Sequence, residues 1–210
     1  MARDNCIPKI KLCGLSRPED IEAANKCKPE YIGFVFWEKS KRKVDRKKAR
    51  ELREKLDPDV KVVGVFVDER IEVIAELLND GIIDIAQLHG SEDESYIKEL
   101  KAVTDKPVIQ AFQIKDKSDI IAAMGSSADM LLLDSGKGTG SSFDWELLRN
   151  VNREFFLAGG LNLSNIEAAL VSITPYAVDV SSGIETEGYK DPVKMQEFVN
   201  IVRNARKDKS

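Results

Sequence analysis

The stretch MLLLD, residues 130–134, is a short apolar run that ends in a carboxylate. Its length and composition are those of a buried β-strand. Other runs along the chain have the same character, and each is rich in Val, Ile, Leu or Phe. In chain order the predicted strands span residues 9–13, 31–36, 61–67, 83–88, 107–112, 130–134, 155–158 and 176–180. Near-continuous apolar runs of this kind are typical of parallel strands that are covered on both faces.

Amphipathic segments with helix start signals lie between these runs. Ser16 precedes a proline and an acidic first turn, Ser91 begins a capping-box spacing, and Asp191-Pro192 precedes the last helix. The alternation predicts an α/β protein, a single-domain (β/α)8 TIM barrel over residues 1–210. The alternative is an open doubly wound sheet. The residues after the first strand, Cys13-Gly14-Leu15-Ser16, lack its G-x-G-x-x-G nucleotide fingerprint.

The composition narrows the classes of function. A net charge of −4 does not favour nucleic-acid binding. No apolar stretch approaches the roughly 20 residues that a membrane span needs, and residues 1–8 hold no apolar signal-peptide core. Three cysteines, an odd and sparse count, suit a reducing compartment, so we expect a cytoplasmic protein. We expect no metal site, because no Cys/His spacing offers ligands. The sequence fits a monomer or a homodimer.

Two ionisable side chains close predicted strands, where barrels of this class place their active sites. Cys13 ends the first strand, and Lys11 lies on the same strand face, where its charge would favour a thiolate base. A buried, inert Cys13 is the alternative, and the residues alone favour it. Asp134 ends the sixth strand, where partial desolvation would raise its pKa and suit an acid. A helix cap or turn is an equally good interpretation of Asp134.

Glycine clusters follow the last two strands. Gly159-Gly160 follows the seventh, and Ser181-Ser182-Gly183 follows the eighth. Glycines let backbone N–H groups approach an anion, and loops at these positions commonly bind phosphate in barrels. The alternative is that they only make tight turns, but their pairing favours phosphate. His89 ends the fourth strand and is a further candidate, and residues 136–140 are expected to form a loop that closes over a ligand.

Taken in order, the strand ends resemble the phosphoribosylanthranilate isomerase family. The resemblance covers nearly the whole chain, and its segments are jointly specific although each is modest. They are Lys11-Leu12-Cys13-Gly14, Gly33-Phe34-Val35-Phe36 with Lys39-Ser40-Lys41-Arg42, Val63-Gly64-Val65-Phe66-Val67, Gln87-Leu88-His89-Gly90, Leu131-Leu132-Leu133-Asp134, Gly138-Thr139-Gly140 with Phe143-Asp144-Trp145, Ala158-Gly159-Gly160-Leu161, and Asp179-Val180-Ser181-Ser182-Gly183.

The resemblance implies an Amadori rearrangement of a phosphoribosyl substrate in tryptophan biosynthesis, with no cofactor. Cys13 matches the family's general base and Asp134 its general acid. Arg42 matches the residue that pairs with the anthranilate carboxylate, for which a guanidinium fork is well suited. His89 and Asp179 are expected near the substrate, and the glycine and serine loops after the seventh and eighth strands near its phosphate.

The chain departs from the family pattern after Gly183. The stretch Ser181-Ser182-Gly183-Ile184-Glu185-Thr186-Glu187-Gly188 lacks a proline that many members have and is one residue shorter, which leaves the shape of this loop open. Two other functions compete. A related sugar-phosphate isomerase of histidine biosynthesis, or a bifunctional enzyme, would use two aspartates as acid and base, and Cys13 argues against both. A non-catalytic phosphate-binding barrel would not need Cys13, Asp134 and Arg42 together.

Overall fold

The fold is a closed barrel of parallel strands, paired in chain order from β1 to β8. The computed structural model describes residues 7–136, 145–149 and 151–205. The barrel strands are β1 Lys9–Cys13, β2 Tyr31–Val35, β3 Lys61–Phe66, β4 Ile85–Leu88, β5 Val108–Gln113, β6 Met130–Asp134, β7 Phe155–Ala158 and β8 Ala177–Val180. This confirms the predicted (β/α)8 architecture. Strand ends differ from the prediction by at most two residues, as at β4, which begins at Ile85.

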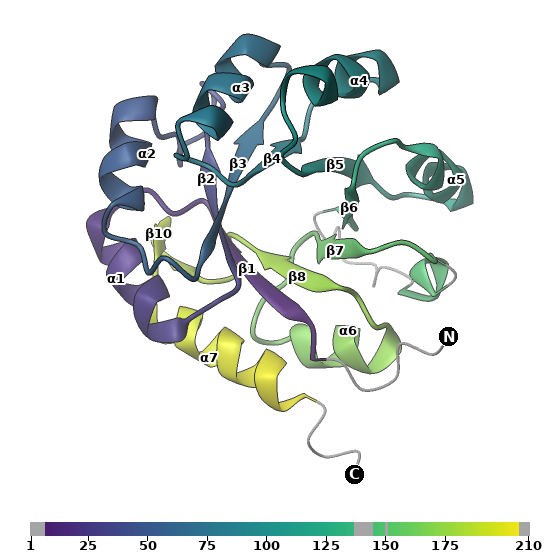
Figure 1. Cartoon of the computed structure of the whole chain (residues 1–210). Coiled ribbons are helices and arrows are strands. Elements are labelled where there is room, and N and C mark those ends of the chain that lie inside the picture. The colour runs from purple at the N-terminus through teal and green to yellow at the C-terminus, as the bar shows by residue number, and fades with distance from the viewer. Residues whose placement is uncertain (1–6, 137–144, 150, 206–210) are drawn as a thin grey trace.

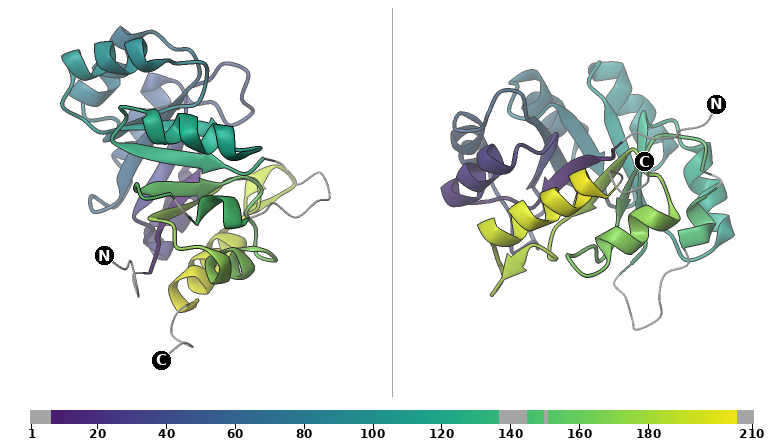
Figure 2. Two further views of the ribbon diagram at one scale, coloured as in Figure 1. Left: turned by 90° about the vertical axis from the view of Figure 1, so that its right-hand side faces the viewer. Right: turned by 90° about the horizontal axis from the view of Figure 1, so that it is seen from below.

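Helices surround the strands on the outside (Figure 1). They are α1 Pro18–Cys27, α2 Arg46–Arg53, α3 Ile71–Asn79, α4 Glu94–Val103, α5 Lys117–Gly125, the 3-10 helix η1 Trp145–Leu148, α6 Ile166–Ser172 and α7 Pro192–Asn204. The last helix, α7, packs against both α1 and α6 (Figure 2), so the end of the chain closes the ring of helices beside its beginning. Within the described ranges, no helix has the length and apolar character that crossing a bilayer requires.

Two predicted helix caps are wrong, and in each case an aspartate explains why. The residue before α1 is Arg17, and the N–H of Ser16 instead donates to Asp20 Oδ2 at 2.9 Å. Asp93 caps α4 through the N–H of Tyr96. Ser91 bonds across to the β3 loop, where Asp68 accepts its hydroxyl. The predicted cap Asp191 is confirmed at α7.

Alternation along the strands creates two apolar layers. One fills the barrel itself and includes Val63, Ile109, Leu132 and Phe156. The larger layer lies between the outer strand faces and the helices. Polar side chains on the inward face are therefore confined to the barrel interior and its mouth, which is where a site can form.

A short hairpin follows β8 and resolves the loop that the sequence left open. Strands β9 Glu185–Thr186 and β10 Tyr189–Lys190 are antiparallel, and Lys190 pairs with Glu185. Both turn residues, Glu187 and Gly188, have positive φ, at 54° and 83°. Such a two-residue turn matches the natural twist of paired strands. A tight turn at Glu187 and Gly188 thus accommodates a loop that is one residue shorter than the family pattern.

Candidate active site

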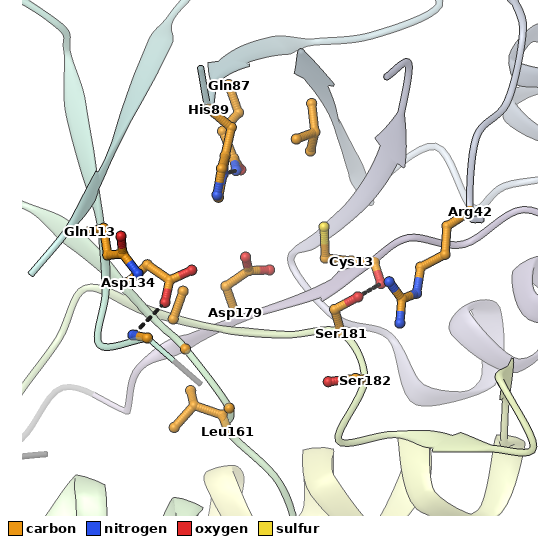
Figure 3. Close-up of a pocket in the computed structure, with 15 residues that line it drawn as sticks. Cys13, Arg42, Gln87, His89, Gln113, Asp134, Leu161, Asp179, Ser181 and Ser182 are labelled. Atoms are coloured by element: carbon orange, nitrogen blue, oxygen red, sulfur yellow. Dashed lines mark hydrogen bonds between the residues drawn. The ribbon is translucent and has the colours of Figure 1, made fainter. Parts of the chain in front are cut away.

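A cavity of about 650 Å³ opens at the carboxyl ends of the barrel strands. Figure 3 shows side chains from opposite sides of the barrel meeting there, with Cys13 and Asp134 on either side of Asp179. The cavity is lined by Cys13, Arg42, Val65, Gln87, His89, Gln113, Asp134, Gly136, Ala158, Gly159, Gly160, Leu161, Asp179, Ser181 and Ser182.

Cys13 sits at the end of β1 in a space that its neighbouring strand leaves free. Gly33 of β2 is its partner in the strand register. A Cβ on Gly33 would come within 2.7 Å of the Cys13 sulfur and 3.1 Å of its Cα. The Gly-Phe-Val-Phe segment thus has a steric role, because only glycine at its first position leaves room for the thiol.

Lys11 lies beneath Cys13 and is fully buried. Its Nζ atom donates to Asp179 Oδ1 at 3.0 Å and to Gln87 Oε1 at 2.8 Å. Burial lowers the pKa of Lys11, but the charges of Asp179 and Cys13 and the hydrogen bonds to them together outweigh burial and hold this pKa above its ordinary value. The predicted inward direction of Lys11 is confirmed, and the ammonium is part of an ordered network.

Burial raises the pKa of the Cys13 thiol above its ordinary value, against the positive charge of Lys11, which lowers it. The negative charge of Asp179 raises this pKa further, and the positive charge of Lys190 lowers it. The predicted electrostatic effect of Lys11 therefore has the expected sign but is smaller than that of desolvation. The neutral thiol is the favoured form of Cys13 at neutral pH.

The same hydrogen-bond network determines which ring nitrogen of His89 carries the hydrogen. An ammonium group can only donate, so Gln87 turns its carbonyl oxygen to Lys11 and its amide nitrogen to His89. Gln87 Nε2 lies 3.0 Å from His89 Nδ1. An Nδ1 atom that accepts a hydrogen bond carries no proton, so the ring keeps its hydrogen on Nε2. His89 lines the cavity as a neutral hydrogen-bond donor.

Asp134 ends β6, and its carboxylate is held by the turn that follows. The N–H of Gly136 donates to Asp134 Oδ1 at 2.7 Å. Gly159, with φ at 97°, leaves room for this carboxylate, since a Cβ there would lie 2.6 Å from Oδ1. Asp134 is partly exposed to the cavity.

Of the family segments beyond it, Gly138-Thr139-Gly140 and Phe143-Asp144 lie outside the described residues, as does most of the predicted closing loop.

Arg42 enters the cavity from the loop after β2, with its stem against Gly14. A Cβ on Gly14 would come within 2.5 Å of Arg42 Cδ. Its guanidinium makes a two-pronged ion pair with Glu185 of the hairpin, from Nε to Oε1 at 2.6 Å and from Nη2 to Oε2 at 2.8 Å. This ion pair raises the pKa of Arg42. The sequence had suggested no protein partner for Arg42.

The two glycine and serine loops form the wall beside Cys13 and Asp134. Gly159, Gly160, Ser181 and Ser182 all line the cavity, as predicted from their positions. Ser181 Oγ donates to the carbonyl of Cys13 at 3.1 Å. Gly183 is different from the expectation. It packs behind the cavity wall, where a Cβ would lie 2.0 Å from the carbonyl oxygen of Leu161. It therefore joins the two loops instead of lining the cavity.

Sequence reasoning missed three charged residues around the site. Glu185 and Lys190 lie beyond the recognised motif. Their spacing is that of two paired residues in a hairpin with a two-residue turn, which could have predicted that their side chains meet. Glu92 was assigned to a helix start but is buried. Its carboxylate accepts the N–H groups of Asp68 and Gly90, both at 2.7 Å, and so ties together the loops after β3 and β4. In the described part of the chain, no three His, Cys, Asp or Glu side chains gather as a metal site would require.

A closed barrel whose mouth gathers a thiol, carboxylates, a guanidinium and glycine-rich loops has the arrangement of a (β/α)8-barrel enzyme. Residues 10–201 match the family model described as N-(5'phosphoribosyl)anthranilate (PRA) isomerase. The chain is 47% identical to N-(5'-phosphoribosyl)anthranilate isomerase of Endomicrobium trichonymphae, over 94% of this chain and 100% of that protein. The chain therefore belongs to the phosphoribosylanthranilate isomerase family, the enzymes of tryptophan biosynthesis that the strand-end motifs had indicated.

Solved structures agree with this assignment. One is phosphoribosyl anthranilate isomerase in complex with reduced 1-(o-carboxyphenylamino)-1-deoxyribulose 5-phosphate, with a TM-score of 0.84 and 32% identity over 94% of this chain and 99% of that one. Another is a monomeric form of the dimeric isomerase from Thermotoga maritima, with a TM-score of 0.83, 32% identity and the same coverage. Each match covers 99% of the other chain, so the similarity extends over the complete barrel.

Proposed function

We propose that the cavity catalyses the family's Amadori rearrangement, converting N-(5-phosphoribosyl)anthranilate to 1-(2-carboxyphenylamino)-1-deoxyribulose 5-phosphate, with Asp134 as general acid and Cys13 as general base. The observation that carries this proposal is that one cavity is lined by both groups, with Arg42 beside Cys13 and the glycine and serine loops between them. The proposal treats residues 1–210 as one isomerase domain.

In the proposed first step, Asp134 protonates the ring oxygen of the furanose and the ring opens to a protonated Schiff base. The positive charge of this imine makes the C2 proton acidic, which removes the need for a cofactor. Cys13 then takes the C2 proton and leaves an enolamine, which tautomerises to the ketone. The hydrogen bond from Gly136 and the space at Gly159 orient Asp134 for its role.

The base role of Cys13 has to be reconciled with a thiol that is neutral at neutral pH. Lys11 beneath it favours the thiolate, and its ion pair with Asp179 keeps the ammonium in place. Deprotonation is therefore assisted by a fixed charge, and a base whose pKa lies near or above the working pH remains an effective proton acceptor.

Arg42 is proposed to bind the substrate's anthranilate carboxylate, and His89 and Asp179 its sugar. The glycine and serine loops are proposed to bind the phosphate, with Gly183 supporting them from behind. We infer a cytoplasmic enzyme from the cysteine content, and a monomer or homodimer, for which the dimeric Thermotoga maritima isomerase is the precedent.

The test is a fluorescence assay. The substrate is generated in place from anthranilate and phosphoribosyl pyrophosphate by the upstream transferase, and its fluorescence is followed after the protein is added. Rapid loss that disappears in Asp134→Asn and persists in Asp105→Asn supports the proposal, because Asp105 is exposed and distant from the cavity. Absence of any loss at high protein concentration would overturn it and leave a phosphate-binding barrel.

A further inference from the structure

Glu185 holds two cations at the edge of the cavity. Its Oε1 atom accepts Arg42 Nε and Lys190 Nζ, both at 2.6 Å, and its Oε2 atom accepts Arg42 Nη2 at 2.8 Å. The Glu185 side chain is 9% exposed and that of Lys190 is 2% exposed, whereas that of Arg42 is 32% exposed. Of the three groups, Arg42 alone lines the cavity. Glu185 and Lys190 thus form a buried support behind it.

The hairpin fixes where the Glu185 carboxylate lies. Glu185 and Lys190 are direct partners across β9 and β10, and such pairs project their side chains on the same face. The positive φ angles of Glu187 and Gly188 select the turn that sets this register. Lys194 Nζ also donates to the backbone carbonyl of Glu185 at 2.7 Å, which ties the hairpin to α7. A carboxylate held on a rigid element can orient a flexible side chain.

A count of donors separates the roles of the two cations. The Lys190 ammonium makes its hydrogen bonds to Glu185, to the Ser181 carbonyl at 2.8 Å and to Ser181 Oγ at 3.3 Å. Its three donors are thereby used. Arg42 gives Nε and one hydrogen of Nη2 to Glu185, and no described residue accepts a side-chain hydrogen bond from its Nη1. The edge of the guanidinium formed by Nη1 and Nη2 keeps its donors for a second carboxylate.

The net charge of this group also supports a second, anionic partner for Arg42. One carboxylate faces two cations, so a positive charge remains in the Arg42, Glu185 and Lys190 group after pairing. Burial raises the pKa of Glu185, but the hydrogen bonds and positive charges of Arg42 and Lys190 together outweigh burial and keep this pKa below its ordinary range. Glu185 therefore stays ionised at neutral pH and orients Arg42 without cancelling the charge that would attract an anionic substrate.

We propose that Glu185 is a positioning residue for substrate specificity: it holds one edge of the Arg42 guanidinium so that the other edge receives the aromatic carboxylate of the substrate. This inference rests on the proposed function, because it assumes that Arg42 binds that carboxylate. Glu185 itself does not touch the substrate.

The experiment compares two probes by isothermal titration calorimetry. One is reduced 1-(o-carboxyphenylamino)-1-deoxyribulose 5-phosphate, and the other is the same molecule without its carboxyl group. We expect Glu185→Gln to weaken binding of the carboxylated probe about tenfold, within the coupling range of contacting residues, and to leave the other probe unaffected. In an Arg42→Met background the same change should have no further effect. Glu187→Gln removes a charge from the same hairpin and serves as the matched control.

Kinetics supply a second readout. If Glu185 only orients a binding group, Glu185→Gln raises KM about tenfold and changes kcat by less than about threefold. Equal weakening of both probes would assign Glu185 to the general shape of the loop and overturn the proposal. Tighter binding of the carboxylated probe would also overturn it, because Glu185 would then compete for Arg42. If the wild-type protein binds neither probe, the proposed function fails as well.

Discussion

Lys11 on β1 and Asp179 on β8 are direct partners where the barrel closes, and their side chains form a 3.0 Å ion pair inside it. The pair joins strands at opposite ends of the sequence and lies beneath the proposed base. Its ammonium also reaches Gln87, and through Gln87 it sets the tautomer of His89. Lys11 thus takes part in the closure of the barrel and lowers the pKa of the Cys13 thiol. Through Gln87 it also determines the tautomer of His89.

Breaking this ion pair should destabilise the protein. Lys11→Met leaves the Asp179 carboxylate, whose side chain is 10% exposed, without its cation, and we expect a loss of about 3–5 kcal/mol in the free energy of unfolding. The double variant Lys11→Met/Asp179→Asn removes both charges and should recover most of that loss. Denaturant unfolding measures both. Equal losses in the single and double variants would mean that packing, and not charge, is responsible.

Removing the thiol should slow turnover without abolishing binding. Cys13→Ala is expected to lower kcat by roughly 10²-fold to 10⁴-fold, the range for loss of a general base. Cys27→Ala is the control, since Cys27 is also a buried thiol but lies on α1 and not in the cavity. Steady-state kinetics with both variants make the comparison. A near-normal rate in Cys13→Ala would show that another group removes the proton.

The pH dependence should report the environment of Cys13. A base acts in its deprotonated form, and burial raises the pKa of this thiol above its ordinary value. We therefore expect kcat/KM to go on rising with pH beyond about 8.5, where a free thiol titrates. In Cys13→Asp the rise should move to acidic pH, because a carboxyl group titrates near 4. An unchanged profile in this variant would assign the titration to another group.

The space at Gly33 should matter to both stability and rate. Gly33→Ala forces a Cβ within 2.7 Å of the Cys13 sulfur. The expected cost is about 1–3 kcal/mol, as for other overpacked sites, together with a lower kcat as the thiol is displaced. Gly125→Ala is the control, because a Cβ there meets nothing within 4 Å. We expect that change to stay within about 0.5 kcal/mol. Similar behaviour of the two variants would remove the steric argument.

The tautomer of His89 can be observed directly. His89 is the single histidine of the chain, so its ring nitrogens give one set of signals in a ¹⁵N-edited NMR spectrum. We expect hydrogen on Nε2 and a bare Nδ1, because Gln87 Nε2 can only donate to Nδ1. Gln87→Met removes the donor to Nδ1 and should shift the signals toward a mixture of tautomers. Hydrogen on Nδ1 in the wild-type protein would contradict the orientation assigned to Gln87.

Much of the site was predictable because parallel strands bring their carboxyl ends together. Cys13 and Asp134 each follow a recognisable apolar run, and alternation puts Lys11 on the face of Cys13. The structure places both strand ends, Arg42 and His89 around one cavity. The place of Gly183 in a glycine and serine cluster predicts that it binds phosphate together with its neighbours. Only the approach of its backbone to Leu161 showed that it supports the wall.

Helix starts were less predictable, and Ser91 illustrates the reason. A serine three residues before an acidic residue has the spacing of a capping box, but Asp68 accepts the N–H and the hydroxyl of Ser91, and Asp93 accepts the Tyr96 N–H at the start of the helix. Which aspartate or serine caps a helix depends on loops that approach from another strand. Local spacing does not encode that approach.

By itself, the sequence determined the barrel, the strand ends that carry Cys13 and Asp134, and the family, because each follows from local patterns of apolar runs and short motifs. Only the tertiary structure decided the pairings. Arg42 meets Glu185 across 143 positions of sequence, and Lys11 meets Asp179 across 168. Such contacts depend on how the barrel closes and on the register of a two-residue turn, which bring distant charges to one side of the molecule and which no local spacing specifies.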